Sequence, residues 1–152
     1  MKVLLTLFAV FMTSLTVHST QLPAQLKFNA SVHLKNNEPY TMQIVLIKKS
    51  ETSKKVKYKG HATVPNLAQP IEVRMEVRVS NMYRIEMWLE ELVLETEKYS
   101  LAHLLGSPLS AKAEVWETVF DDFCHIGDDL RSGSCVSRYR VSHGTATLQV
   151  TP

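Results

Sequence analysis

Residues 54–80 of the 152-residue chain read KKVKYKGHATVPNLAQPIEVRMEVRVS, and over most of this stretch every second residue is apolar. The residues between them are charged or polar. Side chains of a β-strand point alternately to opposite faces, so this pattern predicts two strands, each with one apolar and one wet face. Pro65 and Pro70 bracket the loop that joins the two strands.

The same alternation recurs on both sides of this stretch, in residues 26–34, 40–47 and 83–89. Turn residues separate the runs, among them Asn36-Asn37-Glu38-Pro39 and Ser80-Asn81-Met82. Because short loops join neighbouring runs, we expect five strands that pair as an antiparallel meander with a single apolar face.

The register of this meander is constrained, because a slip of one residue would turn every apolar side chain outward. We predict a central apolar row that runs through Val32, Met42, Gly60, Met75 and Met87. The next row would run through Ala30, Ile44, Tyr58, Val77 and Ile85. On the wet face, the same register sets Lys59 opposite Glu76 and Arg78 opposite Arg84.

The pattern changes after residue 94. Ser100 is a suitable N-cap for a short helix over residues 101–105, which Gly106 ends. Alternation returns in residues 115–123 and 135–150, and the apolar parity changes at Gly144, which predicts a β-bulge there. The whole pattern predicts an all-β fold of about seven strands with one short helix. It favours an up-and-down barrel or half-barrel, with a β-sandwich as the alternative.

The first 19 residues, MKVLLTLFAVFMTSLTVHS, contain one lysine, an apolar run and a small residue at the end. This is the organisation of a secretory signal peptide, and the run is too short for a membrane span. We predict cleavage after Ser19, which leaves residues 20–152 as one secreted, extracellular all-β domain.

Charge and cysteine content narrow the range of partners. The 17 lysines and arginines nearly balance the 15 aspartates and glutamates, and the resulting formal charge of +2 gives no overall attraction to nucleic acid. The chain has two cysteines, Cys124 and Cys135. In an oxidising compartment we expect them to form a disulfide worth about 3 kcal/mol on the chain-entropy model, with two buried free thiols as the alternative.

The central apolar row predicts a place for a ligand, because Gly60 has no side chain and three flexible methionines surround it. We therefore expect a carrier that buries a hydrophobic, lipid-like small molecule on its concave apolar face. Its ligand-binding residues would be Val32, Met42, Tyr58, Gly60, Met75 and Met87. The alternative is that ordinary core side chains fill this space, from Leu101, Leu104, Leu105, Trp116 or Phe120.

A second candidate surface is rich in lysine. Six lysines fall within residues 48–59, and strand alternation aims Lys55, Lys57 and Lys59 to one side. Together with Lys54, this row suits a sulfated glycan, an anionic membrane surface or an acidic protein. An extracellular interaction module is therefore the alternative function, and a solvated strand face that discourages edge pairing is the structural alternative.

Asn29-Ala30-Ser31 is an N-glycosylation sequon, and Asn29 has the outward parity of its strand. In a secreted chain this predicts a glycoprotein, with Asn29 as the acceptor.

Catalytic and metal-binding patterns are scarce in the sequence. No H-x-x-x-H, H-E-x-x-H or G-x-S-x-G spacing occurs, and the aspartates around residues 121–129 lack EF-hand spacing. We therefore expect neither an enzyme nor a metal or cofactor.

The size and meander order are similar to those of the lipocalin barrel. The glycine-x-tryptophan signature of that family near the first strand is absent, because Trp88 and Trp116 lie far downstream. The similarity is one of architecture and assigns no residue roles.

Overall fold

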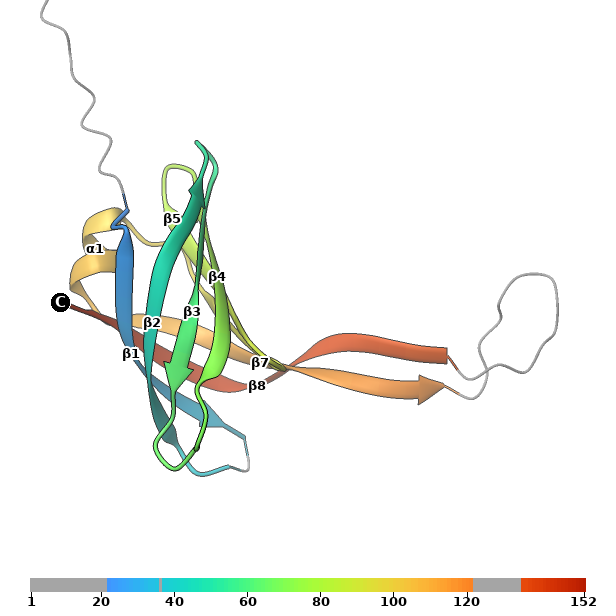
Figure 1. Cartoon of the computed structure of the whole chain (residues 1–152). Helices are drawn as coiled ribbons and strands as arrows, with labels where there is room; N and C mark the ends of the chain where they lie inside the picture. Colours follow the sequence, from blue (N-terminus) through green and yellow to red (C-terminus); the bar gives the residue numbers. More distant parts are fainter. Residues whose placement is uncertain (1–21, 36, 122–134) are drawn as a thin grey trace, which may run out of the picture.

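The computed structural model describes residues 22–152, except residue 36 and residues 122–134. In this part of the chain, eight antiparallel strands follow one another in sequence order and close into a barrel (Figure 1). The strands are β1 (Gln25–Leu34), β2 (Tyr40–Glu51), β3 (Lys55–Thr63), β4 (Ile71–Val79), β5 (Tyr83–Leu89), β6 (Leu92–Thr96), β7 (Leu109–Asp121) and β8 (Cys135–Thr151). The helix α1 (Leu101–Gly106) lies between β6 and β7.

The barrel closes because β8 pairs with β1, from Lys27 opposite Thr151 to Leu34 opposite Gly144. The predicted all-β up-and-down barrel is therefore confirmed, and the half-barrel and sandwich alternatives are excluded. The strand that the sequence analysis missed is β6. Its five residues include Val93 and Leu94, which are both buried, so it lacks the alternation that identifies a strand.

The barrel interior holds one hydrophobic core, to which each of the eight strands contributes buried side chains. The largest fully buried side chains are Phe28, Leu26, Ile44, Leu46, Met75, Ile85, Met87, Leu94, Leu104, Leu109, Leu148 and Val32. On β1 and β4 the buried residues have the predicted inward parity. The alternation in the sequence therefore separates the interior of the barrel from its surface, as expected.

The predicted register is correct for β4 and β5, where Met75 lies opposite Met87 and Arg78 lies opposite Arg84. It is wrong for the earlier pairs, since Met42 lies opposite Ala30, and Gly60 lies opposite Leu46 and Val73. Lys59 accordingly lies opposite Arg74, and Glu76 lies opposite Lys57. In each of these pairs the observed register differs from the predicted one by an even number of residues, so every side chain stays on its predicted face.

The helix α1 begins and ends where the sequence indicates. Ser100 is its N-cap, and the Ser100 hydroxyl accepts a hydrogen bond from the backbone N–H of His103 at 3.2 Å. Leu104 is fully buried, which fastens the helix to the core at one end of the barrel (Figure 1).

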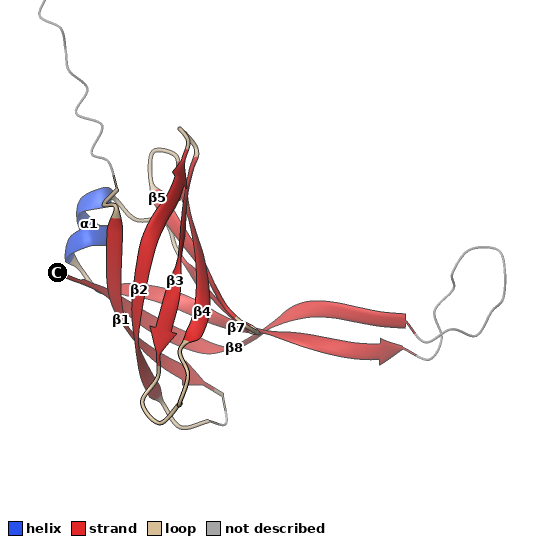
Figure 2. Ribbon diagram, in the orientation of Figure 1, coloured by secondary structure: helices blue, strands red, loops and turns tan. Residues whose placement is uncertain are grey.

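The strands β7 and β8 continue beyond the barrel as a two-stranded arm (Figures 1 and 2). The pairing of β6 with β7 stops at Val115, and the pairing of β1 with β8 stops at Gly144. From there to Asp121 opposite Cys135, the two strands pair with each other. The register shifts at the base of the arm, where Ala113 lies opposite Gly144 and the next residue of β7 lies opposite Ser142. This is the bulge predicted at Gly144.

Candidate functional site

The residues predicted to bind a ligand lie in the barrel core. Val32, Met42, Tyr58, Met75 and Met87 are at most 3 % exposed and belong to one cluster of contacting side chains. The interior of an eight-stranded barrel is just wide enough for side chains to fill. Packing therefore accounts for the position of these five residues, and it brings Leu104 of α1 into the same cluster, as the core alternative proposed.

Gly60 has a backbone reason to be glycine. A Cβ atom at this position would lie 1.8 Å from the carbonyl oxygen of Val45 and 2.9 Å from the Cα of Leu46. The space expected beside Gly60 is therefore occupied by the backbone of β2, which approaches too closely for any other residue.

The apolar pocket that the structure does present lies at the end of the barrel opposite α1. It has a volume of about 480 Å³ and is lined by the end of β1, the beginning of β2, the β3–β4 and β5–β6 connections and the start of the arm. We call this pocket the mouth. Its half-buried apolar residues are Leu34, Tyr40, Val64, Ile71, Leu92 and Val115, and the buried Met42 and Leu89 also line it.

The side chain of Leu67 forms an exposed apolar part of the rim of the mouth. It lies in the β3–β4 connection, lines the mouth and is 54 % exposed. A single exposed leucine is ordinary by itself, but this one lies at the edge of an apolar pocket, where a bound ligand would contact it.

The turns that form the mouth also hold strained backbone. Within the described residues, the non-glycine residues with positive φ are Asn66, at 74°, and Glu90, at 53°. Both line the mouth. The left-handed conformation costs a residue such as glutamate about 1 kcal/mol or more, and backbone strain of this kind is concentrated at functional sites.

Two tyrosines mark the two ends of the barrel. At the mouth, burial raises the pKa of Tyr40 above its ordinary value, so its hydroxyl stays protonated and neutral. At the other end, burial and then the charge of Glu51 raise the pKa of Tyr58 to about 12. The Tyr58 hydroxyl donates a hydrogen bond to the carbonyl oxygen of Pro23 at 2.7 Å, so it holds the segment before β1 in place.

The predicted lysine surface is present, and carboxylates of β4 balance it. Lys55 Nζ lies 2.7 Å and Lys57 Nζ 3.7 Å from Glu76, while Lys59 Nζ lies 3.3 Å from Glu72. The hydrogen bond from Lys55 is the main reason that the pKa of Glu76 lies below its ordinary value of 4.5. Lys54 is exposed beyond this row. The lysines therefore lie on a surface of mixed charge.

A network of charges fixes the base of the arm. Arg140 on β8 reaches Glu86 on β5 at 2.6 Å and lies over the ring of Trp116 at 5.2 Å. Glu86 is 7 % exposed and has a second partner in Arg78 at 3.6 Å. Arg138 pairs with the carboxylate of Glu91, beside the mouth, at 2.5 Å. The sequence analysis named Arg78 and Trp116 in other roles but predicted none of these contacts, because they join strands that are far apart in the chain.

Several predicted features fall outside the described residues. The signal peptide at 1–19 and Cys124 lie there, and the side chain of Cys135 is not described, so the disulfide remains a prediction. The described part of the chain contains no group of three or more metal-ligating side chains. Nor does it contain a helix that is long and apolar enough to cross a membrane.

Comparison of the chain with protein-family models, with curated proteins and with solved structures finds no match.

Proposed function

We propose that this protein is a secreted, non-enzymatic carrier that binds a hydrophobic small molecule at the mouth of the barrel. The mouth itself is the observation that carries the proposal: an apolar pocket of about 480 Å³ with an exposed leucine on its rim. Pockets that hold small molecules are mostly apolar, contain a few polar groups and measure about 300–1,000 Å³. Small eight-stranded barrels are either filled by their own side chains or hold one small ligand, and here core side chains fill the interior, which leaves the mouth for the ligand.

Binding at the mouth requires no chemistry, only burial of apolar surface. Met42 and Leu89 form the floor, and the connections around Leu67 form the wall that is open to solvent. The neutral Tyr40 hydroxyl offers one hydrogen bond to a polar group on the ligand. A compact ligand with an apolar body and one polar group fits this lining best.

The alternative, an interaction module that holds a polyanion on the lysine surface, has less support. Lys55, Lys57 and Lys59 all lie within 3.7 Å of Glu72 or Glu76. A sulfated glycan, an anionic membrane or an acidic protein would have to displace these carboxylates. The new ion pairs between the exposed lysines and the polyanion would then be weakened by salt.

The test uses a neutral fluorescent probe, N-phenyl-1-naphthylamine, with the chain that has lost residues 1–19. We expect saturable binding that Leu67→Ser weakens about fivefold, because the ligand loses roughly half of a leucine contact, worth about 1 kcal/mol. Ile47→Ser is the matched control, since Ile47 is 53 % exposed on β2 and does not line the mouth.

Three results would overturn the proposal: no saturable binding, equal binding by wild type and Leu67→Ser, or equal losses in Leu67→Ser and Ile47→Ser. A heparin column eluted with a salt gradient tests the alternative on the same preparations. Strong retention that Lys55→Glu with Lys57→Glu abolishes would favour the lysine surface instead.

A further inference from the structure

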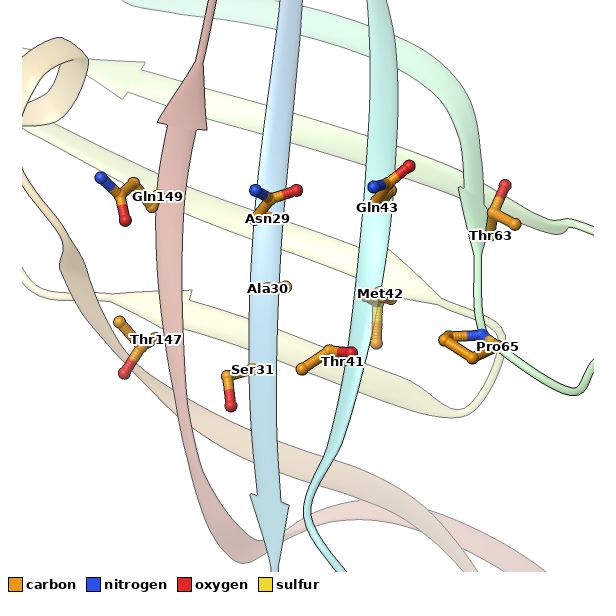
Figure 3. Close-up of a pocket in the computed structure, with 10 residues that line it drawn as sticks. All are labelled: Asn29, Ala30, Ser31, Thr41, Met42, Gln43, Thr63, Pro65, Thr147 and Gln149. Carbon is orange, nitrogen blue, oxygen red and sulfur yellow. The ribbon is translucent and has the colours of Figure 1, made fainter.

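Asn29 lies at the centre of a hollow on the outer surface of β8, β1, β2 and β3. The hollow has a volume of about 620 Å³, and Figure 3 shows the side chains that line it. No lining residue carries a charge: they are Asn29, Ser31, Thr41, Gln43, Thr147 and Gln149, with Thr63, Pro65, Ala30 and Met42. This surface contrasts with the ion pairs that cover β3 and β4.

The lining groups are ordered in two rows by the register of the strands. Asn29 lies opposite Gln149 on one side and opposite Gln43 on the other, so three amide side chains lie abreast (Figure 3). In the next row, Ser31 lies between Thr147 and Thr41. The hollow therefore offers amide and hydroxyl groups that both donate and accept hydrogen bonds, next to the methyl groups of threonine.

We propose that Asn29 is an N-glycosylation site and that the first sugars of the glycan lie in this hollow. The inference rests on the proposed secretion of the chain and is independent of the proposed ligand. Asn29-Ala30-Ser31 is the one acceptor sequon among the 152 residues. The Asn29 side chain is exposed and points away from the core, so an attached glycan extends into solvent and displaces no buried group.

The uncharged hollow suits a glycan on chemical grounds. A neutral oligosaccharide presents hydroxyl, acetamido and C–H groups, and it would leave a charged surface poorly solvated. The amides of Gln43 and Gln149 flank the attachment point on both sides, within reach of the first sugar's polar groups.

The order of the strands along the chain leaves Asn29 accessible to the glycosylating enzyme while the rest of the chain is being synthesised. In the finished barrel β1 is paired on both sides, with β2 and with β8, which would hold Asn29 away from an enzyme's active site. However, β8 comes after β2 to β7 in the order of the described strands, so it is synthesised much later than β1. At about 5–20 residues per second, synthesis takes on the order of ten seconds to pass from β1 to β8, and during that time β1 lacks one neighbour.

The reaction is a group transfer from a lipid-diphosphate-linked oligosaccharide, catalysed by a membrane-bound oligosaccharyltransferase. The Asn29 amide nitrogen forms a bond to C1 of the donor's first sugar and loses a proton. The bond between C1 and the diphosphate oxygen breaks, and the lipid diphosphate leaves. No oxidant or reductant is needed.

The test is expression of the full chain, with residues 1–19, in cultured eukaryotic cells. We expect secreted protein whose intact mass exceeds that of the polypeptide by one N-glycan, and which peptide-N-glycosidase reduces to the polypeptide. The same enzyme converts the acceptor asparagine to aspartate, which should mark Asn29 in a peptide map.

Two variants should lose the whole glycan mass by different routes. Asn29→Gln keeps an amide in the row but is no acceptor, and Ser31→Ala keeps Asn29 but destroys the sequon. Ser31→Thr should keep the glycan. Asn37→Gln is the matched control, because Asn37 is also an exposed asparagine but is followed by Glu38-Pro39, and it should leave the mass increment unchanged.

The possible results distinguish a failure of the proposed glycosylation from a failure of the proposed secretion. Protein that appears in the medium with the mass of the bare polypeptide overturns the glycosylation of Asn29 and leaves the proposed secretion intact. Protein that stays in the cytosol overturns both. A glycan that survives in Asn29→Gln and Ser31→Ala places the modification elsewhere and refutes the site.

Discussion

Replacing Gly60 with alanine should destabilise the barrel, because the added methyl group has no space. Its Cβ would lie 1.8 Å from the carbonyl oxygen and 2.8 Å from the carbonyl carbon of Val45. Both atoms belong to the backbone of a paired strand, so no flexible side chain can move aside. Overpacking of a core costs about 1–3 kcal/mol, and we expect a loss near the upper end, about 3 kcal/mol.

Thermal unfolding followed by circular dichroism measures this loss. A change of 1 kcal/mol shifts the Tm of a domain of this size by about 4 °C, so Gly60→Ala should unfold about 12 °C below wild type. Gly144→Ala should behave alike, since a Cβ there would lie 1.9 Å from the carbonyl oxygen of His33. Gly106→Ala is the matched control, because a Cβ at this helix residue would meet nothing within 4 Å. It should be neutral or stabilise by up to about 1 kcal/mol.

The refuting result is a Gly60→Ala protein with the Tm of wild type. If, in addition, that variant bound the naphthylamine probe more weakly, Gly60 would serve to leave room for a ligand, as the sequence suggested. Equal losses of stability in all three variants would also refute the reasoning, because the distances predict that Gly106 differs from the other two.

Two further predictions concern charged residues. Arg140→Met should lower the free energy of unfolding by about 1–2 kcal/mol, because it leaves the nearly buried Glu86 with only its longer ion pair, to Arg78. Denaturant unfolding measures this loss. The double variant Arg140→Met with Glu86→Gln should recover most of it. Glu76→Gln should flatten the acid side of the stability profile. The pKa of Glu76 is lowered in the folded state, chiefly by Lys55, so the stability from this carboxylate is present above pH 4.5 and is lost as the pH falls through the folded pKa. Urea titrations at several pH values between 3 and 7 measure this, and an unchanged profile would contradict it.

The faces of the strands could be predicted from the sequence, whereas their register could not. Alternation separates inward from outward residues, and a shift of two residues leaves that separation intact. The pairing of Met42 with Ala30 and its predicted pairing with Val32 therefore satisfy the apolar pattern equally well. Turn geometry and bulges choose between them, such as the register shift between Lys48 and Ser50, and neither has a periodic signal.

The candidate site was harder to predict than the fold, because its residues come from strand ends and turns that are far apart in the sequence. Leu92 and Val115 are paired across β6 and β7, but Leu67 belongs to the β3–β4 connection, and only the folded barrel brings it to the same pocket. The one local signal was an isolated leucine in the polar segment 65–70, PNLAQP. The base of the arm gave no signal either, since Arg140 and Glu86 belong to β8 and β5.

Gly60 and Gly144 together explain why we propose the mouth, rather than the interior, as the place for a ligand. At each glycine the backbone of a neighbouring strand enters the space of a side chain, Val45 of β2 in one case and His33 of β1 in the other. Such close approaches accompany tight bends of strands, and they let eight strands close around a narrow cross-section. Inside a narrow barrel, side chains such as Phe28, Met75 and Met87 meet at the axis and leave the interior packed. At the end opposite α1, where the strands end in turns and no described helix covers them, the apolar side chains of the mouth pack against the core but remain half-buried (Figure 1). The packed interior is therefore the reason that we place the proposed ligand at the rim of the barrel.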